Sequence, residues 1–170
     1  MSRIRLALSF IIALTATPAA LAAETQAWYQ VAVVVFAQPP DTDEDLTDQP
    51  PFAWSSDARE PIPLPEGQSG LYAAYEQLRR SPDFRPLLHL AWLQPAEPER
   101  LSFPYHVRGE TVEGMLSLER GEYLYAIVDM EYRAADGTVH RLRERRQLKF
   151  NEIYYLDHPA FGVLVKVSPR

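Results

Sequence analysis

The alternation of apolar and polar residues predicts mainly strands in this chain. Residues 28–36 are apolar on both alternating faces, which is typical of a central strand that is covered on both sides. Residues 87–94 are short, apolar and bounded by prolines, and we predict a buried strand there. Residues 71–78 instead carry apolar side chains at helical spacing, with Ser69 as a cap, which predicts one helix with a single apolar face.

The second half of the chain alternates as an antiparallel meander does. Residues 113–120, 123–133 and 138–150 each place apolar side chains on one face, and turn residues separate the three segments. A last strand is predicted over residues 163–167. We therefore expect an α+β fold with a mostly antiparallel sheet, a helix packed on one face of it, and a long proline-rich connection.

The last two strands of this meander have a predictable register. A three-residue loop over 135–137 would bring the apolar positions of both strands onto one core face. On the other face, acidic side chains of the first strand would lie opposite basic side chains of the second. The expected opposing pairs are Leu124 with Leu148, Asp129 with Arg143, and Glu131 with Arg141.

A proline-rich, acidic connection separates the first strand from the helix at residues 39–67. Its prolines exclude regular helix and strand. The acidic residues 41–48 begin like a calcium loop, but Leu46 stands where that loop needs glycine and Phe52 where it needs a bidentate glutamate, so we expect no metal site. Phe52 and Trp54 are expected to pin the connection to the domain, and they are candidate partner-binding residues.

Residues 1–23 have the order of a secretory signal. Two arginines precede an apolar run that is too short to span a membrane, and small residues follow that run. We expect cleavage after Ala22 or Ala23. Cleavage leaves residues 24–170 as a single exported domain with no membrane span.

Composition narrows the range of partners and of chemistry. The chain has 17 basic and 23 acidic residues; the expected signal holds two basic and no acidic residues, so the mature charge is 15 minus 23, or −8. This charge argues against nucleic acid as a partner. The sequence has no cysteine, which excludes disulfides, thiolate metal ligands and a lipid anchor on a thiol.

Asp157 and His158 form the pair that most suggests catalysis, because a carboxylate can orient an imidazole base. Adjacent residues of an extended chain point in opposite directions, however, and the sequence contains no G-x-S-x-G or H-E-x-x-H motif. We therefore interpret Asp157, His158, Pro159 and Gly162 as a structured turn. In that turn, Asp157 would bond to backbone N–H groups and Gly162 would take an unusual backbone angle. We expect no enzyme, no catalytic residue and no cofactor.

A row of basic side chains on the last strand of the meander is the remaining candidate site. Together with nearby tyrosines, arginine side chains can hold carboxylates and sugar rings. Cross-strand ion pairs could also use up much of this charge, and in that case the face is a self-neutralised ladder of charges and not a site. The candidate glycan- or peptide-binding residues are Tyr123, Tyr125, Arg141, Arg143, Arg145 and Lys149.

Three segments of the chain carry a resemblance to a known family. They are the opening strand over 28–36 (WYQVAVVVF), residues 84–95 with the ending AWLQP, and, most specifically, residues 154–165 (YYLDHPAFGVLV). In these segments the chain resembles the CsiV family of periplasmic peptidoglycan-binding proteins. The resemblance implies a non-catalytic protein that binds peptidoglycan and supports cell-wall synthesis, as an accessory to a bifunctional penicillin-binding protein and its outer-membrane lipoprotein activator.

Two functions from other classes remain open at this point. A protein-only envelope adaptor would bind its partner through residues 41–60, and their deletion would abolish capture without unfolding the domain. A hydrolase of the cell wall would need a cleft with a perturbed acid or base.

Overall fold

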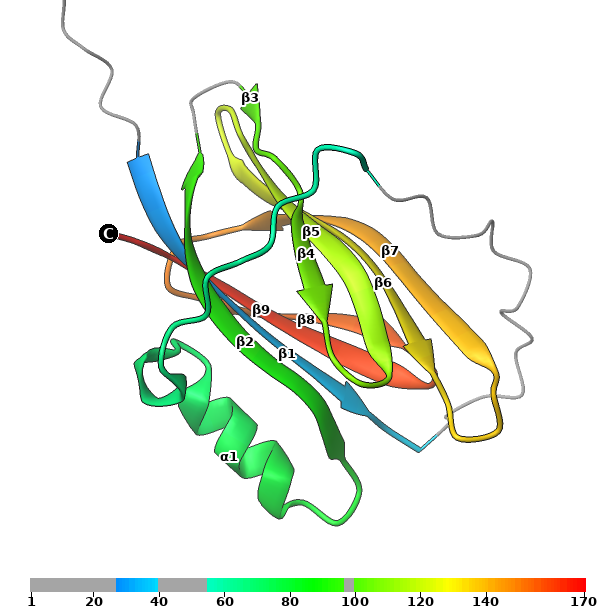
Figure 1. The fold of residues 1–170 in the computed structure, drawn as a ribbon. Helices are drawn as coiled ribbons and strands as arrows, with labels where there is room; N and C mark the ends of the chain where they lie inside the picture. The colour runs from blue at the N-terminus through cyan, green and yellow to red at the C-terminus, as the bar shows by residue number, and fades with distance from the viewer. Residues whose placement is uncertain (1–26, 40–54, 97–99) are drawn as a thin grey trace, which may run out of the picture.

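The computed structural model describes residues 27–39, 55–96 and 100–170 (Figure 1). Strands account for 58% of the described residues, so the domain is mostly β. In chain order the elements are β1 (Ala27–Ala37), η1 (Glu66–Gln68), α1 (Tyr72–Arg80), β2 (Arg85–Ala96), β3 (Arg100–Leu101), β4 (Tyr105–Arg108), β5 (Val112–Arg120), β6 (Leu124–Arg133), β7 (Val139–Leu148), β8 (Ile153–His158) and β9 (Phe161–Pro169).

Several features predicted from the sequence lie outside the described residues. They include the expected signal peptide, the acidic run at 41–48, and the side chains of Phe52 and Trp54. Within the described ranges, none of the helices is both long enough and apolar enough to cross a membrane.

The strands form two antiparallel sheets. One has four strands in the order β2-β1-β9-β8, and the other has five, with β3, β5, β6 and β7 in order and β4 also paired with β5. The expected α+β fold, with one main sheet and a helix packed across it, is therefore wrong. The last strand does not extend the meander: β9 returns to pair with β1, with Val167 opposite Val31, and so completes the backbone hydrogen bonding of that central strand.

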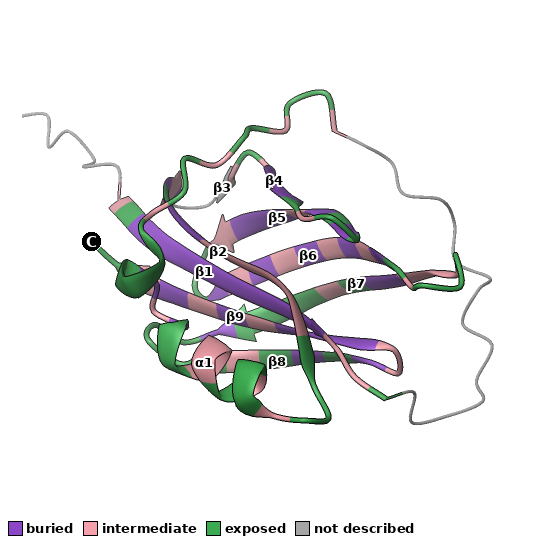
Figure 2. Cartoon of the chain, turned by 60° about the horizontal axis from the view of Figure 1, so that its bottom comes forward, coloured by how far each residue is buried: buried purple, intermediate pink, exposed green. Residues whose placement is uncertain are grey.

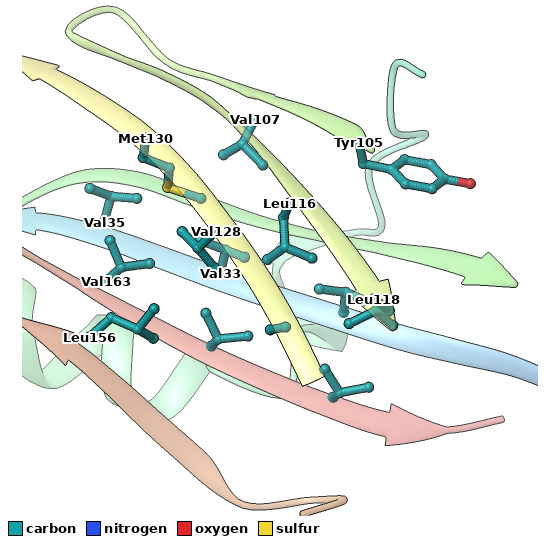
Figure 3. Close-up of a cluster of buried hydrophobic side chains, with 14 of the residues drawn as sticks. Val33, Val35, Tyr105, Val107, Leu116, Leu118, Val128, Met130, Leu156 and Val163 are labelled. Atoms are coloured by element: carbon teal, nitrogen blue, oxygen red, sulfur yellow. The ribbon is translucent and has the colours of Figure 1, made fainter. Parts of the chain in front are cut away.

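The main core lies between the two sheets (Figure 3). Val33 and Val35 of β1 and Val163 of β9 belong to one buried cluster with Val128 and Met130 of β6. All five side chains are fully buried. Because strand side chains alternate, each of these strands also presents a second row of side chains that faces away from this core.

A second, smaller cluster lies on the other side of β1 and β2. It contains Ala32, Val34 and Phe36 of β1 together with Leu71, and partly buried side chains of α1 such as Leu78 contact it. No residue of α1 is itself buried, and Figure 2 colours the helix as a mixture of exposed and intermediate residues.

The predicted register of the meander is confirmed. β5, β6 and β7 are consecutive antiparallel neighbours, as their alternation indicates. The observed pairs are Leu124 with Leu148, Asp129 with Arg143, and Glu131 with Arg141.

The first strands differ from their predicted limits in one respect. β1 is an interior strand, as predicted, but β2 runs from Arg85 to Ala96 and so includes the two prolines that were expected to bound it. β2 is an edge strand, which tolerates residues that have no N–H to donate.

Ser69 does not cap α1 as predicted; its hydroxyl accepts a hydrogen bond from the N–H of Leu71, one residue before the helix.

Candidate binding groove

The outer face of the five-stranded sheet is the floor of a groove of about 660 Å³. Side chains that alternate away from the core form this floor, and they come from three neighbouring strands. The floor residues are Met115 and Ser117 of β5, Ile127 and Asp129 of β6, and Arg141 and Arg143 of β7.

Two chain segments form the walls of the groove. One contains Ser55 and Asp57, and the other is the stretch 101–104. Phe103 is 47% exposed, and the guanidinium of Arg59 lies 3.6 Å from the centre of its ring. This cation–π contact joins the two walls and leaves aromatic surface open to a ligand.

Backbone hydrogen bonds hold the walls against the sheet. The N–H of Arg59 donates to the carbonyl of Pro104, and the N–H of His106 donates to the carbonyl of Arg59, each at 2.9 Å. The hydroxyl of Ser102 accepts a hydrogen bond from the N–H of Leu118 of β5 at 2.8 Å. The first wall therefore runs beside the start of β4, and its position depends on the sheet (Figure 1).

A side-chain pair reinforces the first wall. Nδ1 of His106 and Oε1 of Glu60 lie 2.8 Å apart, and Nε2 of His106 lies 3.4 Å from Oε1 of Glu113 on β5. The imidazole is only 7% exposed. His106 therefore connects the segment that carries Asp57 to two strands of the sheet.

The most buried charges on the floor are paired with each other. Nε of Arg141 donates to Oδ1 of Asp129 at 2.8 Å, and Nη2 donates to Oδ2 at 2.7 Å. The two side chains are 7% and 16% exposed. The hydrogen bond to Asp129 raises the pKa of Arg141 above its ordinary value. Two short parallel bonds of this kind neutralise the floor where it is deepest.

Arg145 lies on the same face, beside the groove. Its Nε and Nη2 donate to Oε2 and Oε1 of Glu119 at 2.9 and 3.0 Å, and its guanidinium lies 3.5 Å from the centre of the Tyr125 ring. The hydrogen bond from Arg145 lowers the pKa of Glu119. Arg145, Glu119 and Tyr125 are thus engaged with one another.

The six binding residues proposed from sequence fall into three groups. Arg141 and Arg143 line the groove, Tyr125 and Arg145 lie next to it, and Tyr123 and Lys149 are not part of its lining. Sequence reasoning missed the walls, above all Asp57 and Phe103. In the sequence, Phe103 is an aromatic residue next to Pro104, and the structure places it between the short strands β3 and β4. The sequence does not indicate against which face of the sheet its ring lies.

The segment from Asp157 to Ala160 contains the last two residues of β8 and the two-residue turn that leads into β9. The carboxylate of Asp157 accepts hydrogen bonds from the hydroxyl of Tyr155 and from Nε2 of Gln38, and not from the backbone N–H groups that we expected. His158 is 5% exposed, and its Nδ1 accepts a hydrogen bond from the N–H of Ala160 at 3.1 Å. Burial and the bond to Asp157 raise the pKa of Tyr155 to about 12.

Gly162 is required for space and not for its backbone angle. Of the glycines in the described ranges, Gly137 has a positive φ and Gly162 does not, so the expected unusual angle at Gly162 is wrong. A Cβ at Gly162 would lie 2.5 Å from the ring of Phe36 and 2.6 Å from that of Tyr155. The missing side chain lets these two rings stack, with centroids 6.1 Å apart.

Comparison with known proteins identifies a family. A family model described as "Peptidoglycan-binding protein, CsiV" matches residues 48–170. No curated protein and no solved structure matches the chain. The matched region includes every residue of the groove.

Proposed function

The chain belongs to the CsiV family of peptidoglycan-binding proteins, and from this premise we propose that it binds peptidoglycan through the groove on the outer face of β5, β6 and β7. The observation that carries the proposal is the groove itself. It combines a volume of about 660 Å³ with an exposed aromatic ring, Phe103, and an exposed guanidinium, Arg143. Aromatic rings pack on sugar rings, and arginines bind carboxylates, so both parts of a wall fragment could be held here.

We also propose that binding involves no chemical reaction. Asp129, the acidic side chain on the floor, has both oxygens bonded to Arg141. That leaves Asp57 on the wall as the carboxylate of the lining that is not bonded to an arginine in the described ranges, and hydrolysis of a glycosidic bond typically needs two carboxylates that flank the bond. Among the described residues, no group of three or more His, Asp or Glu side chains is placed to hold a metal ion.

The family also supports a place in the cell envelope. We propose that residues 1–23 export the chain to the periplasm and that the mature domain supports wall synthesis there. A bifunctional penicillin-binding protein and its lipoprotein activator are the partners that the resemblance of residues 28–36, 84–95 and 154–165 suggests.

Co-sedimentation with purified peptidoglycan sacculi tests the proposal. We expect the mature protein to pellet with sacculi, and less so at high salt, because arginine contacts are screened. Phe103→Ser should weaken retention about tenfold, since it removes the exposed ring of the groove. Tyr123→Ser is the matched control: this ring is equally exposed, at 49%, but lies outside the groove.

A parent protein that stays in the supernatant would contradict wall binding and favour the protein-only adaptor. That alternative needs a sharper variant than deletion of residues 41–60, because Arg59 and Glu60 are bonded to β4. Replacing residues 41–54 by a Gly-Ser linker of equal length leaves those bonds in place. Loss of an envelope partner with this variant, without loss of sacculus binding, would assign partner capture to the connection.

A further inference from the structure

We propose that the groove recognises a zwitterionic amino-acid group, meaning a carboxylate and an ammonium on one short chain, as at the free end of the diamino acid in a wall stem peptide. This inference rests on the proposed function and specifies which part of the wall the groove takes. The inference follows from which charged side chains around the groove are already paired with each other and which are open to a ligand.

Arg143 is the basic side chain that can accept a new carboxylate. Its side chain is 70% exposed, and its Nε lies 3.9 Å from Oδ2 of Asp129, which is beyond hydrogen-bonding distance. Arg141 already occupies both oxygens of Asp129 at 2.7 and 2.8 Å. The groove therefore holds a neutralised pair and, beside it, a guanidinium whose donors face an open volume.

The neighbouring arginine shows the contrast. Arg145 lies two residues further along the same face of β7, but its Nε and Nη2 both bond to Glu119, and its plane covers Tyr125. The Nε–Nη2 side of this guanidinium is therefore occupied by Glu119, which also compensates its charge. Arg143 has no such bond among the described residues, and this places the carboxylate subsite within the groove.

Asp57 supplies the opposite charge on the wall. It is exposed, its carboxylate accepts a hydrogen bond from the hydroxyl of Ser56 at 3.3 Å, and it makes no ion pair with any residue in the described ranges. Asp57 and Arg143 line the same groove from different sides, one on the wall and one on the floor. A ligand ammonium can thus meet Asp57 while its carboxylate meets Arg143.

The lining of the same groove also contributes apolar surface. Met115 and Ile127 on the floor and Phe103 on the wall contribute side chains that match an aliphatic chain better than a polar sugar face. The glycan backbone of the wall carries N-acetyl groups, which are neutral, and it has no free ammonium. A groove with one open cation and one open anion is therefore more complementary to the peptide than to the glycan.

The test compares four ligands with three variants of the mature protein. The ligands are intact sacculi, glycan strands stripped of peptide by an amidase, and a soluble stem peptide with its diamino acid end either free or amidated at the carboxylate. The variants are Arg143→Gln, Asp57→Asn and the control Arg146→Gln. Arg146 is an exposed residue of the same strand, pairs with Glu144 at 2.6 Å, and alternates to the other face.

We expect stripped glycan to bind at least about tenfold more weakly than the free stem peptide, because amidase treatment leaves it a lactyl carboxylate but no ammonium beside it. Arg143→Gln should weaken peptide binding about tenfold and remove the preference for the free carboxylate over the amide. Asp57→Asn should weaken peptide binding to a similar extent, whereas Arg146→Gln should leave it unchanged. Thermal unfolding of each variant checks that these losses do not come from misfolding.

Different results would overturn different claims. Equal binding of stripped glycan and free peptide would overturn this inference and leave wall binding through the groove intact. Peptide binding that survives both Arg143→Gln and Asp57→Asn would overturn the assignment of the two charges. No retention on intact sacculi would overturn the proposed function, and this inference with it.

Discussion

The outer faces of the two sheets are built in opposite ways. On the four-stranded sheet, Ala32, Val34 and Phe36 alternate along β1 and are all buried, so this face is apolar and covered by the chain itself. On the five-stranded sheet, the equivalent row carries Asp129 on β6 and Arg141 on β7, and it remains open as a groove. One face is closed by apolar contacts, and the other stays open because its charges neutralise each other.

This difference separates stability from binding. Burial of apolar surface stabilises the folded state by about 25 cal/mol for each Å² removed from water, so the fold is most stable when an apolar face is covered. A charged face whose groups are already paired gains little from a cover and can remain available to a ligand. Changes on the covered face should therefore affect unfolding, and changes at the open charges should affect binding.

The largest effect is expected on the covered face. Phe36 is 4% exposed, and its ring contacts Phe84, at a centroid distance of 5.4 Å, and Tyr155. Phe36→Ala should lower the free energy of unfolding by about 3–5 kcal/mol, because it removes a buried ring and leaves a cavity. Urea unfolding measures the loss, and sacculus binding of the folded variant at low temperature should equal that of the parent. A loss below about 1 kcal/mol would mean that this face is not closed as described.

A smaller effect is expected from the paired charges of the open face. Arg141→Met leaves the carboxylate of Asp129 without its two short bonds, and we expect a loss of about 2–3 kcal/mol. The double variant Arg141→Met with Asp129→Leu removes both charges and should recover most of this loss. If the double variant were as unstable as the single one, the pair would contribute packing and not charge compensation. Chemical denaturation of the three proteins distinguishes these results.

Sequence patterns predicted the paired face well because its determinants are local. Alternation and a short loop fix the register of β6 and β7, and the predicted opposing residues are the observed ones. The shortest bonds nevertheless run diagonally. Arg141 donates two short bonds to Asp129, its diagonal neighbour, because a long arginine side chain reaches diagonal partners across the strands. Arg143, directly opposite Asp129, lies farther from it, at 3.9 Å.

The second sheet and the groove walls could not be predicted in the same way. Alternation tells which face of a strand is apolar, but it does not tell which sheet the strand joins, and β9 pairs with β1 across most of the chain. The walls depend on contacts such as Arg59 with Phe103 and His106 with Glu60, which join residues more than forty positions apart in sequence. Only the folded sheet brings such residues together.

Two buried polar side chains, one on each sheet, differ in how they are paired. Arg141 makes two short bonds to Asp129, whereas Nε2 of His158, in the four-stranded sheet, is buried without a hydrogen-bond partner among the described residues. The ring of His158 lies 5.6 Å from that of His140 on β7. Burial lowers the pKa of His158 below its ordinary value of 6.5, His140 lowers it further, and Asp157 acts in the opposite direction. His158, whose ring meets that of His140 across the two sheets, is therefore an acid-sensitive point of the domain.

The free energy of unfolding should fall as the pH drops below about 6.5. The decrease should be smaller than that caused by Phe36→Ala, because the protonation of a single side chain is involved. The unfolded chain protonates His158 at its ordinary pKa, while the folded chain does so only at a lower pH. Between these two values the unfolded state binds more protons, so stability rises with pH; the stabilisation is complete above the unfolded pKa and is lost as pH falls through the folded one. Urea unfolding at pH 7.5 and 5.5 measures the difference.

His158→Asn isolates this titration. The Asn Oδ1 can still accept the N–H of Ala160, which Nδ1 of His158 accepts at 3.1 Å, but the side chain has no proton to gain over this range. We expect the pH dependence between 7.5 and 5.5 to flatten in this variant. His140→Gln should reduce the slope without removing it, because burial is the larger cause of the shift at His158. If His158→Asn kept the pH dependence of the parent protein, another group would be responsible for the acid sensitivity. The contrast between His158 and the paired Arg141 of the five-stranded sheet would then not hold.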